Sequence, residues 1–317
     1  MSTKLKVFLG IVLGWATVAG LTLHLTGVDL GSLWGIALIT VLYMPSPLVA
    51  AVLAERGLVR DRFRLPRAPR AVARFLLMPP VVVVGFALSY LATVYVGGDV
   101  LGIDAVGGLA TTADQLMAGA ADLLGQQAVD AAGPPPPFPV LLLASIWGAV
   151  LAGWTVNAVV AMGEEYGWRG LMWDELKQHG PVRANLLTGF IWGLWHAPLI
   201  LQGYNYPDHR ALGVLAMIAF CIGMSTVLAA LRELTVSVVP VAAAHGTFNA
   251  LAAVLLLAAP GAHPVIAGPL GLLGAALLLL VGVAMWRTLP AHLPQAATAM
   301  AMATTPGTSH RSAAPRT

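Results

Sequence analysis

Two adjacent carboxylates, Glu164 and Glu165, follow an apolar run that extends over residues 139–162. Ionisable groups at membrane depth cost at least a few kcal/mol each, so the ones that a sequence retains usually have a function. Two later apolar runs also contain polar residues: His196 in one, and His245 with Asn249 in the other. We expect these three places to meet in one cavity.

A carboxylate and two imidazoles can activate a water molecule or bind one divalent metal ion. An Asn amide or a His N–H group can stabilise the oxyanion of a tetrahedral intermediate. Glu164 would be partly desolvated in such a cavity, which suits a general base. This set of groups favours hydrolysis of an amide bond over ion transport.

The spacing of the residues predicts which side chains can pair. Glu165 and Arg169 are four residues apart and can pair on one helix face, whereas Glu164 points about 100° away from Glu165. Residues 168–177 look like a continuation of the same helix, with Asp174, Glu175 and Lys177 on a solvated face and a stop near Gly180-Pro181.

Each polar feature also has a purely structural interpretation. Glu164 and Glu165 could be a charged helix end at the lipid headgroups, and His196 could be a core histidine with a satisfied hydrogen bond. His245 and Asn249, again four residues apart, could join two helices by hydrogen bonds. Three such structural explanations together are less probable than any one of them alone.

The ordered set Glu164-Glu165-x-x-x-Arg169, His196 and His245-x-x-x-Asn249 resembles the three motifs of the CAAX protease and bacteriocin-processing family of intramembrane endopeptidases. The resemblance covers roughly residues 139–258. This sequence departs from the family at Trp192, four residues before the histidine, where the family usually has phenylalanine.

The resemblance implies roles for individual residues. Glu164 would activate the attacking water, with His196 beside it, and His245 and Asn249 would hold the carbonyl or oxyanion. Glu165, Arg169 and Trp192 would support this site. Glu164, His196 and His245 could instead bind one divalent metal such as zinc, but a metal-free mechanism would serve equally.

Composition predicts an all-α, polytopic membrane protein. The 317 residues are 58% hydrophobic and only 10% charged, whereas soluble domains carry about 25% charge. Apolar runs of about 20 residues, the length that spans a bilayer, occur eight times, at roughly 6–26, 33–54, 73–96, 140–164, 184–202, 210–230, 236–258 and 265–286. With the N-terminus in the cytoplasm, every Lys and Arg except Arg210 falls on the inner side, as the positive-inside rule requires. Both termini are therefore expected in the cytoplasm.

The chain divides into one transmembrane domain, residues 1–287, and a disordered cytoplasmic tail, residues 288–317. The inner loop from Arg56 to Arg74 contains seven arginines. This loop is either a topology anchor, which we favour, or a site for anionic lipid or an acidic partner. The outer loop 97–138 is predicted to contain a surface helix over residues 111–129. Cys221 is expected to be a small packing residue.

The motifs and the resemblance thus predict an intramembrane endopeptidase that hydrolyses a peptide bond of a membrane-associated protein or peptide, with its cavity open to the cytoplasm. The resemblance implies processing either of CAAX type or of the bacteriocin and peptide-maturation type. A non-catalytic scaffold or immunity protein, or a proton-coupled transporter, is the alternative. The basic residues lie beside membrane segments without interleaved aromatic residues, so no nucleic-acid partner is expected. The abundance of Ala, Val, Leu and Gly suggests the cytoplasmic membrane of a GC-rich bacterium, which makes a CAAX substrate less expected than another peptide.

Overall fold

The computed structural model describes residues 1–289, and this part of the chain forms helices and turns but no strand. Its first half contains α1 (Thr3–Thr26), α2 (Leu33–Leu38), α3 (Ser46–Glu55), α4 (Pro69–Val94), α5 (Ala113–Leu124), α6 (Gln126–Ala132) and α7 (Phe138–Trp154). Its second half contains α8 (Val156–Glu165), α9 (Trp173–Leu176), α10 (Pro181–Trp195), α11 (Ala197–Ile200), α12 (Arg210–Thr235), α13 (Val239–Ala258) and α14 (Leu272–Thr288). Residues 290–317, almost all of the predicted tail, lie outside the described part.

The predicted all-α membrane fold is confirmed. Among the described residues, five helices are long and apolar enough to cross a bilayer, and the bent pair that starts with α7 is a sixth candidate. The five are Thr3–Thr26, Leu33–Glu55, Pro69–Val100, Arg210–Thr235 and Val239–Ala258. The other two predicted spans correspond to α10, with 15 residues, and α14, with 17. The count of eight and the orientation of the termini remain predictions.

The predicted fourth span bends by 52° between α7 and α8, at Thr155. Beyond the bend, α8 continues through a π-helical turn, Tyr166–Met172, into α9. The helix therefore extends past Glu164 before the chain reaches Gly180 and α10 begins at Pro181, as the sequence predicts. This extension matters because it places Glu164 inside a continuous helical segment, where its side chain can meet the histidines of the neighbouring helices.

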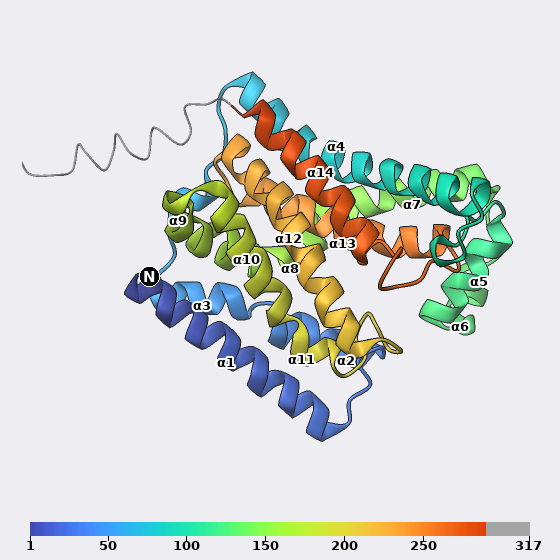
Figure 1. Ribbon diagram of the computed structural model, residues 1–317, viewed down its shortest axis with the longest axis horizontal. Helices are drawn as coiled ribbons and strands as arrows, with labels where there is room; N and C mark the ends of the chain where they lie inside the picture. Colours follow the sequence, from blue (N-terminus) through green and yellow to red (C-terminus); the bar gives the residue numbers. More distant parts are fainter. Residues whose placement is uncertain (290–317) are drawn as a thin grey trace, which may run out of the picture.

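Helices α10 and α12 approach closely through two glycines that are four residues apart on α10. A Cβ atom at Gly189 would lie 2.4 Å from the Cα of Ile222, and a Cβ atom at Gly193 would lie 2.5 Å from the Cα of Ile218. Small residues at this spacing let the backbones of membrane helices pack directly. Figure 1 shows α12 beside both α10 and α14, and these are among the most extensive helix contacts of the molecule. The packing places Trp192 of α10 in the interior, and the half-buried His196 directly follows the last residue of this helix.

We expect Gly193→Ala to destabilise the protein by about 1–3 kcal/mol or more, because the added methyl group can only be accommodated if two backbones separate. Gly148→Ala on α7 is the matched control, since a Cβ atom there meets nothing within 4 Å. Thermal unfolding of the purified variants in detergent measures the effect. Equal unfolding temperatures for the two variants would contradict the close packing of α10 and α12.

The helix predicted over residues 111–129 is present as α5 and α6, which are separated by Gly125. Thr112 and Gln115 form a capping box at the start of α5, which explains why the helix begins there. Figure 1 shows α5 and α6 together at one end of the bundle, beyond α4 and α7.

Candidate active site

The first cluster of the site is a buried charged triad. Arg169 Nη1 donates to both carboxylate oxygens of Glu165, at 2.9 and 3.0 Å, so the predicted pair is confirmed. The same carboxylate contacts His245 on α13, with 2.7 Å between Glu165 Oε1 and His245 Nδ1. All three side chains are at most 5% exposed. Glu165 therefore holds the C-terminal end of α8 against α13.

Glu164 points away from this triad and towards α10. Trp192 Nε1 donates a hydrogen bond of 2.7 Å to Glu164 Oε2, and Glu164 is only 2% exposed. The sequence predicted different directions for the two carboxylates, and the structure confirms this. The carboxylate of Glu164 is thus held by a neutral donor, whereas that of Glu165 is held by charged partners.

Trp192 is the common neighbour of the predicted site residues. The guanidinium carbon of Arg169 lies 4.3 Å from the centre of the indole ring, a cation–π distance. The ring centres of His245 and His196 lie 5.3 and 5.9 Å from that of Trp192. The structure therefore brings Glu164, His196 and His245 around one aromatic residue, although they come from three separate stretches of sequence.

His196 directly follows α10, where the helix breaks before Pro198 because proline lacks the N–H that a continuous helix would need there. Its Nδ1 atom is 2.9 Å from the carbonyl oxygen of Trp192. A carbonyl oxygen can only accept, so Nδ1 carries the proton and Nε2 retains a lone pair. Cys221 Sγ lies 4.0 Å from His196 Nδ1 and is fully buried, in agreement with its predicted packing role.

Asn249 differs from the other predicted residues in its surroundings. It lies one helical turn beyond His245 on α13, but its side chain is exposed whereas that of His245 is buried. Residues four apart on a helix are neighbours on its surface. Asn249 therefore stands at the edge of the cluster rather than inside it.

The arrangement does not fit a metal ion as it stands. Among the described residues, no group of three or more His, Cys, Asp or Glu side chains is placed to hold a metal. The indole ring of Trp192 packs near both histidine rings, and one oxygen of Glu164 already accepts its indole N–H. Metal dependence stays a prediction.

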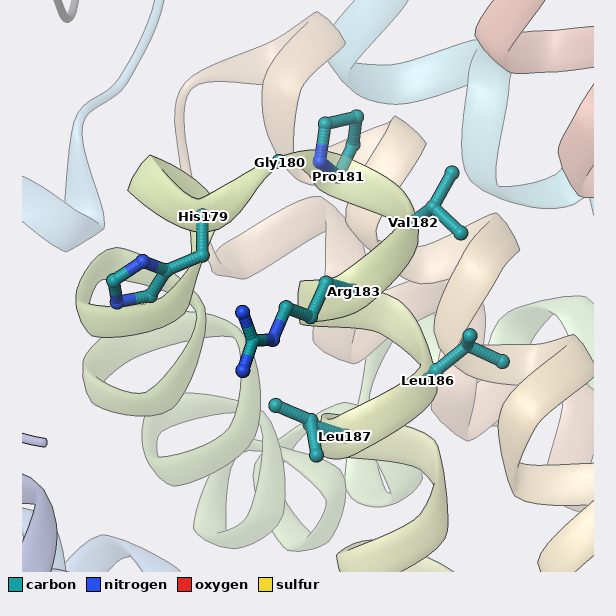
Figure 2. Close-up of a pocket in the computed structure, with 7 residues that line it drawn as sticks. All are labelled: His179, Gly180, Pro181, Val182, Arg183, Leu186 and Leu187. Carbon is teal, nitrogen blue, oxygen red and sulfur yellow. The ribbon is translucent and has the colours of Figure 1, made fainter.

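The predicted site residues do not line either of two hollows in the structure. One hollow, of about 480 Å³, follows a single stretch at the start of α10 and is lined by His179, Gly180, Pro181, Val182, Arg183, Leu186 and Leu187. Figure 2 shows these side chains along one continuous stretch of ribbon that leads into α10, which makes the hollow a surface depression. The other hollow, of about 20 Å³, is entirely apolar in lining and lies between α4, α7 and α13. The cytoplasmic cavity remains a prediction.

Residues 142–251 match the family model described as type II CAAX prenyl endopeptidase Rce1-like. This segment is similar to the Rce1-like family. It contains every predicted site residue from Glu164 to Asn249, so the resemblance predicted from the three motifs is confirmed. A CAAX prenyl protease 2 of Methanococcus maripaludis is 41% identical over 49 residues, which are 15% of this chain and 18% of that protein. The matched stretch thus spans less than a fifth of the relative's length.

The sequence did not predict one partly buried ion pair, between Asp174 inside the matched segment and Arg62 outside it. Asp174 was assigned to a solvated face, but its carboxylate accepts a hydrogen bond of 3.1 Å from the buried Arg62. Arg62 itself was one of seven arginines in the inner loop, and it is 4% exposed. The local sequence gives no periodic signal that separates Arg62 from the arginines around it.

Proposed function

We propose that this protein is an intramembrane endopeptidase that cleaves a peptide bond near the C-terminus of a membrane-associated, CAAX-type substrate. The observation that carries the proposal is the buried Glu164 carboxylate, which accepts a hydrogen bond from Trp192. The rings of His196 and His245 pack around the same tryptophan, within a segment that matches the Rce1-like family model. A buried carboxylate beside two imidazoles is suited to activating water.

In the proposed reaction, Glu164 takes a proton from a water molecule while the water oxygen attacks the carbonyl carbon of the substrate. Trp192 engages Oε2, which leaves Oε1 to receive that proton. The unprotonated Nε2 of His196 accepts a hydrogen bond from the same water and orients it. The products form when the C–N bond breaks and the proton passes from Glu164 to the leaving amine nitrogen.

The negative charge that develops on the carbonyl oxygen needs a hydrogen-bond donor. His245 donates from Nε2 when both of its nitrogens are protonated, and Glu165 is the countercharge that such an imidazolium requires. Asn249, at the edge of the cluster, can donate its amide to the substrate. Its exposure in an apolar helix suits a residue that meets a substrate arriving from the membrane.

We expect Trp192→Phe to lower kcat by about tenfold with little change in KM or in the amount of folded protein. Phenylalanine keeps the ring that packs against Arg169 and His245 but cannot donate to Glu164. A hydrogen bond to a charged group contributes about 1.5–3 kcal/mol, and about 1.4 kcal/mol corresponds to a factor of ten in rate. Steady-state kinetics with one reporter peptide tests this, and an unchanged kcat would mean that the indole N–H does not position the base.

The proposal is tested with purified protein in liposomes and a farnesylated reporter peptide that ends in a CAAX sequence. We expect mass spectrometry to detect loss of the C-terminal residues from the prenylated peptide. The same peptide without the farnesyl group is the control, because it lacks the anchor that brings it to the membrane. Absence of cleavage of either peptide, by protein that is folded, would contradict the proposed substrate class.

We also propose that the arginine-rich loop and the start of α13 face the cytoplasm, so that the site opens to that side. The basis is the distribution of Lys and Arg over the spans.

A further inference from the structure

The loop from Arg56 to Arg74 contains seven arginines, and one of them differs from the rest in its burial. Arg62 is buried, whereas its six companions are exposed: Arg56, Arg60, Arg64, Arg67, Arg70 and Arg74. A topology signal or a lipid-binding loop needs charges that reach the interface or the headgroups. Arg62 therefore has a different role from its neighbours, and its contacts indicate which one.

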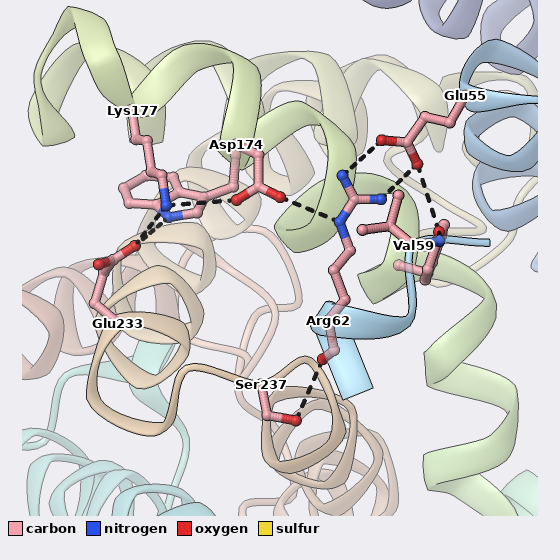
Figure 3. A network of polar contacts seen from close by, with 9 residues as sticks. Glu55, Val59, Arg62, Asp174, Lys177, Glu233 and Ser237 are labelled. Carbon is pink, nitrogen blue, oxygen red and sulfur yellow. Dashed lines mark hydrogen bonds and ion pairs between the residues drawn. The ribbon is translucent and has the colours of Figure 1, made fainter. Parts of the chain in front are cut away.

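The guanidinium of Arg62 joins two separate helices through their carboxylates. It donates to Glu55, the last residue of α3, from Nη1 at 2.6 Å and from Nη2 at 2.8 Å. Its Nε donates to Asp174 on α9 at 3.1 Å. Figure 3 shows the side chain extended between these two carboxylates. Burial lowers the pKa of Arg62, but the hydrogen bonds that it donates to Glu55 and the charges of both acids outweigh this effect and raise the pKa above its usual value.

The same side chain also crosses the π-helical turn, Tyr166–Met172, that continues α8 beyond the two carboxylates of the site. Its guanidinium carbon lies 5.0 Å from the ring centre of Tyr166, the residue directly after Glu165. A Cβ atom at Gly170 would lie 2.9 Å from Arg62 Cδ. Gly170 is therefore the residue that leaves room for the arginine to cross the helix.

The backbone of Arg62 holds a third element, the start of α13. Its carbonyl oxygen accepts a hydrogen bond of 2.8 Å from the N–H of Val238 and one of 3.3 Å from the hydroxyl of Ser237. Figure 3 shows Ser237 reaching the backbone of Arg62. His245 follows Val238 by seven residues, which is about two helical turns or ~10 Å along α13.

We propose that Arg62 is a positioning residue of the site: it fixes α13 against the helix of Glu164 and Glu165, and so keeps His245 in contact with Glu165. The side chain of Arg62 contacts the segment that continues α8, and its backbone binds the start of α13. One residue therefore sets the distance between the helix of Glu164 and Glu165 and the helix of His245. No other arginine of this loop combines burial with contacts to both helices among the described residues. This inference rests on the proposed peptidase activity.

The test compares Arg62→Gln, Arg62→Lys and the control Arg64→Gln in the liposome assay with the farnesylated peptide. The side chain of Arg64 is 62% exposed, and it pairs with Asp61, whose side chain is 77% exposed. We expect kcat to fall at least tenfold in Arg62→Gln with KM within twofold, a partial recovery in Arg62→Lys, and no change in Arg64→Gln.

Hydrogen–deuterium exchange supplies a second measurement that does not require activity. In Arg62→Gln we expect faster exchange in residues 163–176 and 236–248, with unchanged exchange in α1 and α14. If the wild-type protein does not cleave the peptide, the proposed function fails, and the exchange result alone decides whether Arg62 positions the helices. Wild-type kcat and wild-type exchange in a folded Arg62→Gln protein would overturn the inference.

Gly170→Ala is the second variant, to be measured if Arg62→Gln does not accumulate as folded protein. The new methyl group displaces the side chain of Arg62 without removing its charge. We expect the same fall in kcat and the same local increase in exchange as for Arg62→Gln. Wild-type values of both in Gly170→Ala and Arg62→Lys would also overturn the inference.

Discussion

Glu164→Gln is expected to lower the rate of peptide hydrolysis by about 10²–10⁴-fold, the usual contribution of a general base. Glutamine has nearly the same shape as glutamate and can still accept the hydrogen bond from Trp192. It cannot take a proton from water. Because the packing around this residue is retained, the variant should reach the membrane in normal amounts and unfold at the temperature of the wild type or above it.

Glu175→Gln is the matched control for Glu164→Gln. It makes the same chemical change on α9, eleven residues further along, at a side chain that is only half-buried. We expect the control to keep the wild-type rate. A folded Glu164→Gln protein that retains the wild-type rate would exclude Glu164 as the base. It would favour a different catalytic group, whereas an inactive wild-type protein would favour the scaffold or the transporter.

Glu165→Gln is expected to destabilise the protein by about 3–5 kcal/mol, the typical effect of removing one partner of a buried ion pair. Arg169 is 1% exposed and would keep its charge without a countercharge. Its Nε and Nη2 atoms have no hydrogen-bond partner within the part of the chain that the structure describes, so the charge is stabilised by the pair with Glu165 and by the cation–π contact with Trp192. Most protein domains are stable by only about 5–15 kcal/mol, so a large loss of folded protein should follow.

The double variant Glu165→Gln/Arg169→Met separates the charge effect from a packing effect. Removing both charges leaves no unpaired ion in the interior, so stability should recover to within about 1 kcal/mol of the wild type. Asp61→Asn, in an exposed pair with Arg64, is the control and should leave stability unchanged, because exposed pairs contribute little. Thermal unfolding and size-exclusion profiles give the readout, and equal destabilisation of the single and double variants would contradict the account of the triad.

The sequence predicted the parts of this site that depend on local spacing. The pairing of Glu165 with Arg169 follows from their separation of four residues, and the continuation of the helix past Glu164 follows from the character of residues 166–177. The break after His196 follows from Pro198. These features arise within one helix, so a single stretch of sequence contains the information.

Contacts between helices were less accessible to sequence reasoning. Trp192 was recognised as a departure from the usual phenylalanine, but its hydrogen bond to Glu164 depends on how α10 is rotated against α8. The burial of Arg62 depends on three elements that meet only in the folded chain, and the same holds for the role of Asp174. The exposure of Asn249 depends on which neighbours cover α13.

The central claim is that this protein hydrolyses peptide bonds with Glu164. The most direct measurement compares peptide termini by mass spectrometry in cells that lack the protein and receive either the wild type or Glu164→Gln at matched membrane levels. We expect new peptide termini that appear only with the wild type, in proteins or peptides attached to the membrane. Identical termini in the two cell populations, with both proteins folded, would contradict it.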